Sequence, residues 1–221
     1  MCEREIPNDV LVAKNSSSID DLPLGASVAT GSLRRKSQLL NYRPDLNVTE
    51  IRGNVPTRLR KFDESPAEGM LLAYAGLHRL GLDDRIASIV PARIMLPAVG
   101  QGAVAIEVRT DDSDMLRRLR ALDHPETRIC VTAERAFLER LEGGCQVPIG
   151  AFARIEDDRL ILEGVVGSTD GKTVFRRKLE ASVSEAEKLG LTLAEELIDK
   201  GAARLLTDAR ADAATARDAV L

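Results

Sequence analysis

The segment Ser27-Val28-Ala29-Thr30-Gly31-Ser32-Leu33-Arg34-Arg35 passes from a strand pattern to a helix pattern within a few residues. Its first four residues are small, apolar or β-branched, which predicts the end of a strand. Ser32 is of a residue type that caps helix N-termini, and the sequence after it predicts a helix to about Tyr42. A strand that leads directly into a capped helix is the repeating unit of an α/β layer.

The same alternation continues through the first half of the chain. We expect a strand over 47–51, a helix capped by Asn54 that runs to about Phe62, a strand over 69–73, and a helical turn over 75–80 that ends at Gly81. Strands alternating with helices in this way predict an α/β layer with a largely parallel sheet.

The second half has a different pattern. The apolar run 94–108 is expected to be fully buried, and its Gly100-Gln101-Gly102 centre predicts a bend or crossover between domains. We expect helices over 112–122 and 127–141, antiparallel strands over 149–155, 160–166 and 173–179, and helices over 184–189 and 193–206 separated by Gly190. The tail from Ala209 is expected to be poorly ordered. These elements predict a second, α+β module, with the boundary between about 110 and 145.

Composition restricts the class of protein. The 221 residues carry a net charge of -4, aromatic residues make up 3%, and tryptophan is absent, so neither a nucleic-acid-binding protein nor a stacking platform is expected. No apolar run approaches the ~20 residues of a membrane helix, and the charged start does not resemble a signal peptide. Cysteines 2, 130 and 145 form no CxxC pair, and the two histidines lie far apart, so we expect no metal site, reduced thiols and a cytosolic location.

Positive charge is concentrated near the predicted helix N-termini of the first half. Arg34 and Arg35 fall in a first helical turn, where the helix dipole disfavours cations. Strand C-termini and helix N-termini line the ligand crevice of an open α/β sheet, so these arginines, with Ser32, Arg52 and Arg58, are expected to converge on one anion. A solvated basic face is the alternative. Taken alone, Arg79 indicates only an arginine that complements a helix end.

The segment Leu141–Gly150, with the sequence LEGGCQVPIG, contains a cysteine directly after two glycines. A thiol on such a loop is accessible, whereas Cys130 falls on a predicted helix among apolar residues and is expected in the core. The alternative is that Cys145 is a loop residue without a chemical role. An arginine-lined crevice with an accessible thiol nearby suggests a polycarboxylate or phosphate ligand tethered through sulfur.

Five motifs give the chain a specific resemblance. They are TGSLRR at 30–35, RGNVPTRL at 52–59, AGLHRL at 75–80, LPAVGQG at 96–102 and EGGCQVPIG at 142–150. In this order and spacing they resemble the porphobilinogen deaminase family, also called hydroxymethylbilane synthase. Gly31 departs from the family pattern, in which a serine is common.

The resemblance implies a transferase of tetrapyrrole (haem and porphyrin) biosynthesis that condenses four porphobilinogen molecules head to tail and releases ammonia. It implies a dipyrromethane cofactor bound covalently to Cys145, and a monomeric cytoplasmic enzyme without nucleic-acid or membrane partners. The implied cofactor-binding residues are Thr30, Ser32, Arg34, Arg35 and Arg58, and the implied substrate-binding residues are Arg52, Arg58 and Arg79.

The resemblance also implies a fold and a missing part. The fold is a periplasmic-binding-protein-like doubly wound domain, with domain one largely missing, followed by a small α+β C-terminal domain. The expected divisions are a central domain over 1–95, a hinge and return segment over 96–124, and a C-terminal domain over 125–221 that carries the cofactor loop. The family's catalytic aspartate lies in an N-terminal segment whose motifs do not occur here, so we expect no catalytic acid–base residue in this chain and no turnover by it alone. The alternative is a non-catalytic module that binds an anion or a polycarboxylate.

Overall fold

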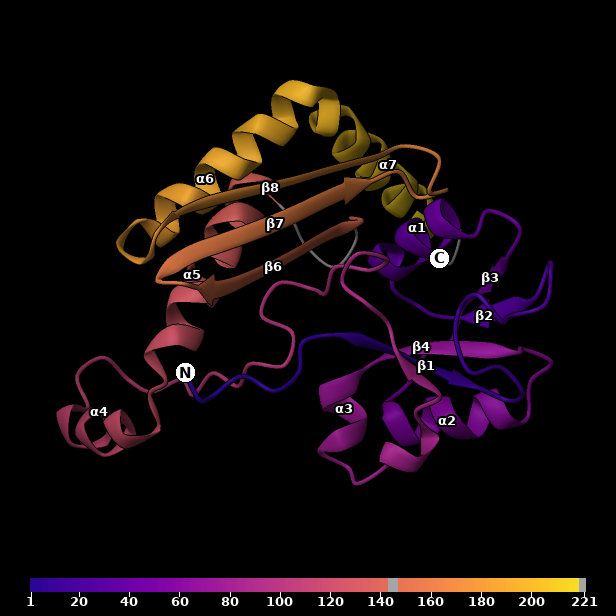
Figure 1. Ribbon diagram of the computed structural model, residues 1–221, viewed down its shortest axis with the longest axis horizontal. Coiled ribbons are helices and arrows are strands. Elements are labelled where there is room, and N and C mark those ends of the chain that lie inside the picture. The colour runs from indigo at the N-terminus through magenta and orange to yellow at the C-terminus, as the bar shows by residue number, and fades with distance from the viewer. Residues whose placement is uncertain (143–146, 219–221) are drawn as a thin grey trace.

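The computed structural model describes residues 1–142 and 147–218, with side chains up to residue 212. Within these residues the strands form a five-stranded sheet and a separate three-stranded sheet, each with its own helices (Figure 1). The chain is therefore of the mixed α/β class, as its sequence pattern predicts.

The five-stranded sheet has the order β3-β2-β4-β1-β5. Strands β2, β3 and β4 run parallel, whereas β1 pairs antiparallel with both β4 and β5. The prediction of a largely parallel sheet therefore holds for β2, β3 and β4 but is wrong for β1 and β5. No strand is predicted from the sequence over 9–13, the segment that forms β1. The strands are β1 (Asp9–Ala13), β2 (Ser27–Ala29), β3 (Asn47–Thr49), β4 (Gly69–Ala73) and β5 (Ser88–Ile89).

Both faces of this sheet are covered, because alternate residues of each strand enter different cores. On β1, Leu11 packs with Leu39 of the first helix, whereas Val10 and Val12 pack with Phe62 and Leu77 of the next two. The predicted helices are confirmed: α1 (Leu33–Tyr42) begins after Ser32, α2 (Val55–Asp63) begins after Asn54, and α3 (Tyr74–His78) follows β4 directly. A short 3-10 helix, η1 (Asp83–Arg85), leads to β5.

The apolar run 94–108 is buried only at its start. Ile94, Met95 and Leu96 are buried, but Val104 and Ile106 are 40% and 46% exposed. The expectation of full burial is wrong beyond Gly102, because this stretch lies in no sheet and is covered on only part of its surface. Helix α4 (Ser113–Leu119) and the 3-10 helix η2 (Arg120–Leu122) follow, and they project from the body of the molecule (Figure 1).

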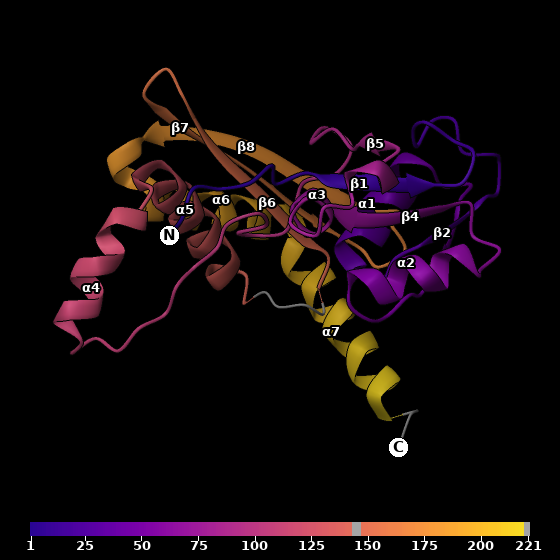
Figure 2. The same ribbon diagram turned by 90° about the horizontal axis from the view of Figure 1, so that it is seen from below.

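The second module matches its predicted pattern closely. Helix α5 (Pro125–Arg140) packs beside an antiparallel sheet of β6 (Ile149–Glu156), β7 (Arg159–Gly167) and β8 (Val174–Ser182), in that order. The chain then continues through η3 (Val183–Glu185), α6 (Ala186–Leu197), the π-helical segment η4 (Ile198–Ala202) and α7 (Ala203–Asp218). Figure 2 shows α7 extending away from the rest of the chain.

Two expectations for the C-terminal helices are wrong. Gly190 does not separate two helices but lies inside α6, where a Cβ atom would come within 2.3 Å of the Ala133 carbonyl oxygen of α5. The glycine is thus a contact point between helices, and the kink occurs instead at Gly201, which has a φ of 105°. The expectation of a poorly ordered tail is also wrong at its start, because α7 continues to Asp218 and Ala209 is 1% exposed.

The packing of α1 against the β7–β8 turn joins the two modules. The Asn41 amide donates to the Gly171 carbonyl at 3.0 Å. A Cβ atom on Gly171, which has a φ of +73°, would lie 2.6 Å from the Ser37 carbonyl oxygen.

Among the described residues, no helix is long and apolar enough to cross a membrane.

Candidate functional site

The N-terminus of α1 holds a buried group of charged side chains, which we call the arginine cluster: Asp9, Arg34 and Arg35. Arg34 binds both oxygens of Asp9, with Nη1 to Oδ2 at 2.6 Å and Nη2 to Oδ1 at 3.2 Å. Arg35 reaches Oδ1 through Nε at 2.9 Å and through Nη2 at 2.8 Å. The Asp9 side chain is fully buried and the two guanidinium groups are nearly so. Two cations therefore share one carboxylate inside the protein.

The charged groups of the arginine cluster shift one another's pKa values. Burial alone would raise the pKa of Asp9, but Arg34 and Arg35 hold it below its ordinary value. Burial lowers the pKa of Arg35, and the charges of Arg34 and Arg58 act in the same direction against Asp9. Arg58 therefore lies close enough to the cluster to influence it. The three residues of the cluster carry one positive charge in excess.

The two arginines differ in how fully the protein binds them. Arg34 also donates to the Leu96 carbonyl at 2.6 Å and to Gln101 Oε1 at 3.4 Å. Beyond Asp9, Arg35 donates only to the Leu71 carbonyl, at 3.2 Å, among the described residues. A guanidinium group has five N–H donors, so Arg35 keeps more of them for another acceptor than Arg34 does.

The sequence predicts that Arg34 and Arg35 converge on an anion, and within the protein both bind the carboxylate of Asp9. Asp9 already compensates one of their charges, which explains how two arginines can occupy a first helical turn. Sequence reasoning missed Asp9 because it lies 25 residues from Arg34, on a strand that was not predicted. A polar residue at the start of an apolar segment was the only signal.

The two predicted hydroxyl residues stabilise the turn before α1. The Ser32 side chain accepts from the Arg35 backbone N–H at 3.4 Å, so it caps the helix as predicted. The Thr30 hydroxyl accepts from the Ser32 backbone N–H at 3.3 Å, and Thr30 is buried. Both hydroxyl groups thus lie in the turn that leads into Arg34 and Arg35.

The other predicted arginines are not all brought together. Arg58 is half-buried and donates to the Gly53 carbonyl at 2.7 Å. Arg79 donates to the carbonyl of Gly102, in the Gly100-Gln101-Gly102 segment, at 2.7 Å. The Arg52 side chain is 82% exposed and pairs with Glu50 at 2.6 Å, so the structure does not place it in the cluster.

A second buried ion pair connects the modules, and no pattern in the sequence predicts it. Arg4 binds both oxygens of Glu134 on α5, at 2.6 and 3.1 Å. Glu134 is 0% exposed and also accepts from the backbone N–H groups of Gly100 at 2.7 Å and Ala153 at 2.8 Å. Burial raises the pKa of Glu134, although Arg4 opposes this.

The glycine loop with Cys145 lies outside the described residues. Of the other thiols, Cys130 is buried in the core of the second module, as predicted. Burial raises the pKa of its thiol to about 11. A thiol with that pKa is almost entirely protonated near neutral pH, so Cys130 is a poor nucleophile.

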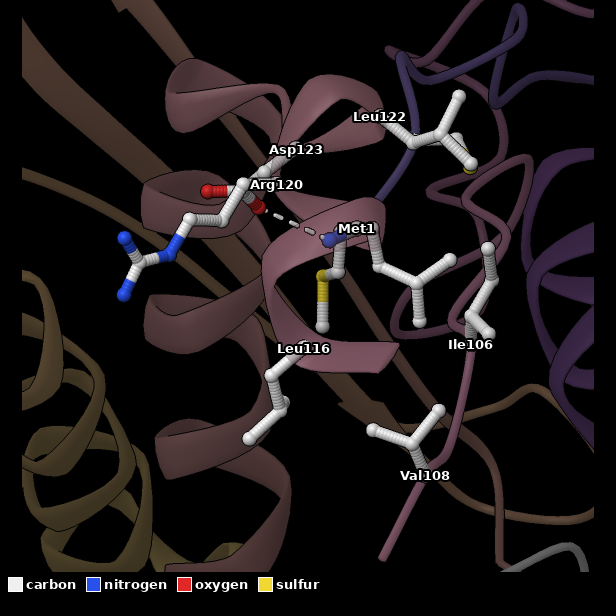
Figure 3. A pocket seen from close by; sticks show the side chains of 9 residues that line it. Met1, Ile106, Val108, Leu116, Arg120, Leu122 and Asp123 are labelled. Atoms are coloured by element: carbon white, nitrogen blue, oxygen red, sulfur yellow. Dashed lines mark hydrogen bonds and ion pairs between the residues drawn. The ribbon is translucent and has the colours of Figure 1, made fainter. Parts of the chain in front are cut away.

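A pocket lies between the N-terminus of the chain, the stretch around Ile106 and helix α4 (Figure 3). Apolar side chains line most of it, including Ile106, Val108, Leu116 and Leu122, and the Met1 amino group binds Asp123 there at 3.0 Å. The pocket holds none of the predicted site residues, so it is not the candidate site.

Comparison with known proteins gives the family. Residues 1–117 match the family model described as "Porphobilinogen deaminase, dipyromethane cofactor binding domain", and residues 128–199 match "Porphobilinogen deaminase, C-terminal domain". This chain belongs to the porphobilinogen deaminase family. The porphobilinogen deaminase of Pelotomaculum thermopropionicum is 51% identical over 210 residues, which cover 95% of this chain and 67% of the relative. That of Carboxydothermus hydrogenoformans is 49% identical over 212 residues, which cover 96% of this chain and 68% of the relative.

Membership of the porphobilinogen deaminase family confirms the resemblance drawn from the five motifs. The chain spans about two thirds of the length of these relatives. The family is one of transferases, and the matched domain is the one that binds its dipyrromethane cofactor. The arginine cluster fits this group, since dipyrromethane carries acetate and propionate side chains and the cluster has an excess positive charge with N–H donors to spare on Arg35.

Proposed function

We propose that the arginine cluster binds a carboxylate of the dipyrromethane cofactor in a hydroxymethylbilane synthase of tetrapyrrole biosynthesis. One observation carries the assignment of this site: two buried guanidinium groups share the single carboxylate of Asp9. A buried charge without a partner is costly, so an anion that binds here gains more than it would at an exposed arginine. A carboxylate of the ligand completes the charge balance of the cluster.

The proposed roles follow from how each side chain is held. Arg35 is the main donor to the cofactor, because it keeps free N–H groups, whereas Arg34 is committed to Asp9, Leu96 and Gln101. Thr30 and Ser32 hold the turn that places Arg35 at the helix start. Arg58 adds positive charge beside Arg35 and is proposed to serve both cofactor and substrate.

Porphobilinogen also carries an acetate and a propionate group, so its binding needs further cations. We assign this role to Arg52 and Arg79, with Arg58. The exposed Arg52 side chain can reach an incoming substrate, and Arg79 is fixed by the Gly102 carbonyl. The cofactor, when bound, supplies the free pyrrole end to which substrate units are added. We propose Cys145 as its attachment point, and we assign no acid–base residue to this chain.

The finer features of the fold belong to the same proposal. We infer a doubly wound, periplasmic-binding-protein-like arrangement for the first module, with divisions at 1–95, 96–124 and 125–221. A monomeric state and a cytoplasmic location are inferred from the family resemblance, as is the absence of nucleic-acid and membrane partners.

The test is the intact mass of the purified chain before and after incubation with porphobilinogen. We expect an adduct of dipyrromethane size on the unchanged chain and none on Cys145→Ser. Arg35→Met should lower the loaded fraction about tenfold, the usual effect of losing a hydrogen bond to a charged group. Lys36→Met is the matched control, since it removes the neighbouring cation of the same helical turn.

The outcomes separate the two candidate functions. Stabilisation of the chain by porphobilinogen without an adduct would favour the non-catalytic anion-binding module. Equal loading of Arg35→Met and the unchanged chain would refute the assignment of the arginine cluster.

A further inference from the structure

The Gly100-Gln101-Gly102 turn brings one glutamine into contact with several parts of the site. Gly100 and Gly102 have φ values of +71° and +87°, which L side chains rarely adopt. A Cβ atom on Gly102 would lie 2.5 Å from the Glu5 carbonyl oxygen, so the turn fits closely against the N-terminal segment. Gln101 therefore projects from a backbone that has little freedom to move.

The side-chain amide of Gln101 binds both hydrogen-bond acceptors and a hydrogen-bond donor. Its Nε2 donates to the Pro7 carbonyl at 2.5 Å and to Asp9 Oδ1 at 3.0 Å. Its Oε1 accepts from Arg34 Nη2 at 3.4 Å. The reverse orientation of the amide would set its oxygen against two acceptors, so the contacts fix the orientation. Neither a carboxylate nor an apolar side chain of this size can make both kinds of contact.

We propose that Gln101 is a positioning residue for Arg35, acting through Asp9. Gln101 and Arg35 share the Oδ1 atom of Asp9, with Arg35 Nε at 2.9 Å from it. With Gln101 in place, the carboxylate is fixed from both sides and presents the Arg35 guanidinium in one orientation. Without it, Asp9 keeps both arginines but loses one of the donors to Oδ1, the oxygen that Arg35 binds. The effect of Gln101 on a ligand rests on the proposed function of the arginine cluster.

The backbone of Gln101 extends this network to the second module. Its carbonyl accepts from Arg4 Nε at 2.9 Å, and the same Arg4 side chain binds the buried Glu134 of α5. Helix α5 ends at Arg140, shortly before the segment that holds Cys145. Gln101 thus contacts both the arginine cluster and the ion pair that anchors the helix leading to the cysteine.

The experiment compares Gln101→Met with Gln38→Met. Gln38 is the matched control, because its buried amide binds the Leu96 backbone, at 2.8 and 3.1 Å, and the Arg34 backbone carbonyl, at 3.4 Å, but not Asp9. Proton exchange at Arg35 Nε is measured by NMR on the 15N-labelled chain, and the fraction of chain that gains the dipyrromethane adduct from porphobilinogen is measured by intact mass on the same samples. Gln101→Asn is the second variant if Gln101→Met does not fold, because its shorter side chain cannot span Asp9 and Arg34.

We expect Gln101→Met to speed exchange at Arg35 Nε and to lower the loaded fraction, each about tenfold, while Gln38→Met changes both less than about twofold. Equal exchange in the two variants would overturn the inference. Faster exchange with unchanged loading would overturn the role toward the cofactor. If the unchanged chain gains no adduct but exchange still separates the variants, the proposed function fails and the positioning of Arg35 by Gln101 stands.

Discussion

Replacement of Arg4 by methionine tests how strongly the buried ion pair holds the modules together. The pair joins the N-terminal segment to α5, with Arg4 Nη1 at 2.6 Å from Glu134 Oε1. Methionine keeps much of the apolar stem of arginine but removes the charge. Among the described residues, Glu134 then keeps only the N–H groups of Gly100 and Ala153 as donors.

The size of the effect follows from burial. Removing one partner of a buried ion pair generally costs about 3–5 kcal/mol, because the other charge stays uncompensated. The two backbone donors remain, so we expect the lower end, about 3 kcal/mol. With an ordinary urea dependence, this lowers the unfolding midpoint by about 1–2 M.

The loss should depend on pH in a defined direction. Burial raises the pKa of Glu134 above its ordinary 4.5, and Arg4 is the main opposing influence. Without Arg4 the folded-state pKa rises further, so the folded protein binds this proton more tightly than the unfolded chain does. The variant therefore regains stability relative to the unchanged protein as pH falls from 7 toward 5.

Urea unfolding at pH 7 and pH 5.5 measures both effects. Arg140→Met is the control. Arg140 lies on α5, as Glu134 does, and pairs with Glu195 at the same 2.6 Å, but both side chains of this pair are about half exposed. An exposed pair contributes at most about 1 kcal/mol. The reasoning is refuted if Arg4→Met costs no more than Arg140→Met, or if its cost does not change with pH.

Three further predictions concern single sites. Gly190→Ala should lower the thermal midpoint by several degrees, because its Cβ would lie 2.3 Å from the Ala133 carbonyl oxygen, whereas Gly76→Ala has no contact closer than 3.5 Å and should be neutral; equal midpoints would contradict this. Cys130 should resist alkylation at pH 8 in the folded chain, since its pKa rises from 9.0 to about 11, and labelling at the rate seen in denaturant would contradict its burial. The two arginines hold the pKa of Asp9 below 3.8, so the contribution of its carboxylate to stability is complete above about pH 4 and is lost as pH falls through the lower folded-state pKa. The stability of Asp9→Asn should therefore fall less steeply below about pH 4 than that of the unchanged chain. Acid-unfolding curves of equal steepness would argue against this.

Sequence reasoning predicted most local elements because their causes are local. The helix caps at Ser32 and Asn54 and the antiparallel strands of the second module depend on residues only a few positions apart. The strand β1 was missed, and with it the mixed direction of the first sheet. The stop assigned to Gly190 was wrong because this glycine serves a contact with α5, distant in sequence, rather than a helix end.

The candidate site divides in the same way. Motifs identified the family, its cofactor and the arginines near the start of α1, since those features are written in short runs of residues. Exposure and pairing could not be predicted from these runs. Arg52 is exposed, while Arg34 and Arg35 are buried against a carboxylate from another strand.

Short runs of residues are enough to predict the family, the helices and strands that local caps and periodicity specify, and the concentration of arginines at one helix start. Which charges meet depends on the folded chain: Asp9 pairs with two arginines, Gln101 contacts Asp9 and Arg34, and Arg4 pairs with Glu134. The physical reason is that a buried charge is tolerated only where the fold brings a partner to it. The partners here lie from 25 to 130 positions apart, a separation that no local pattern records.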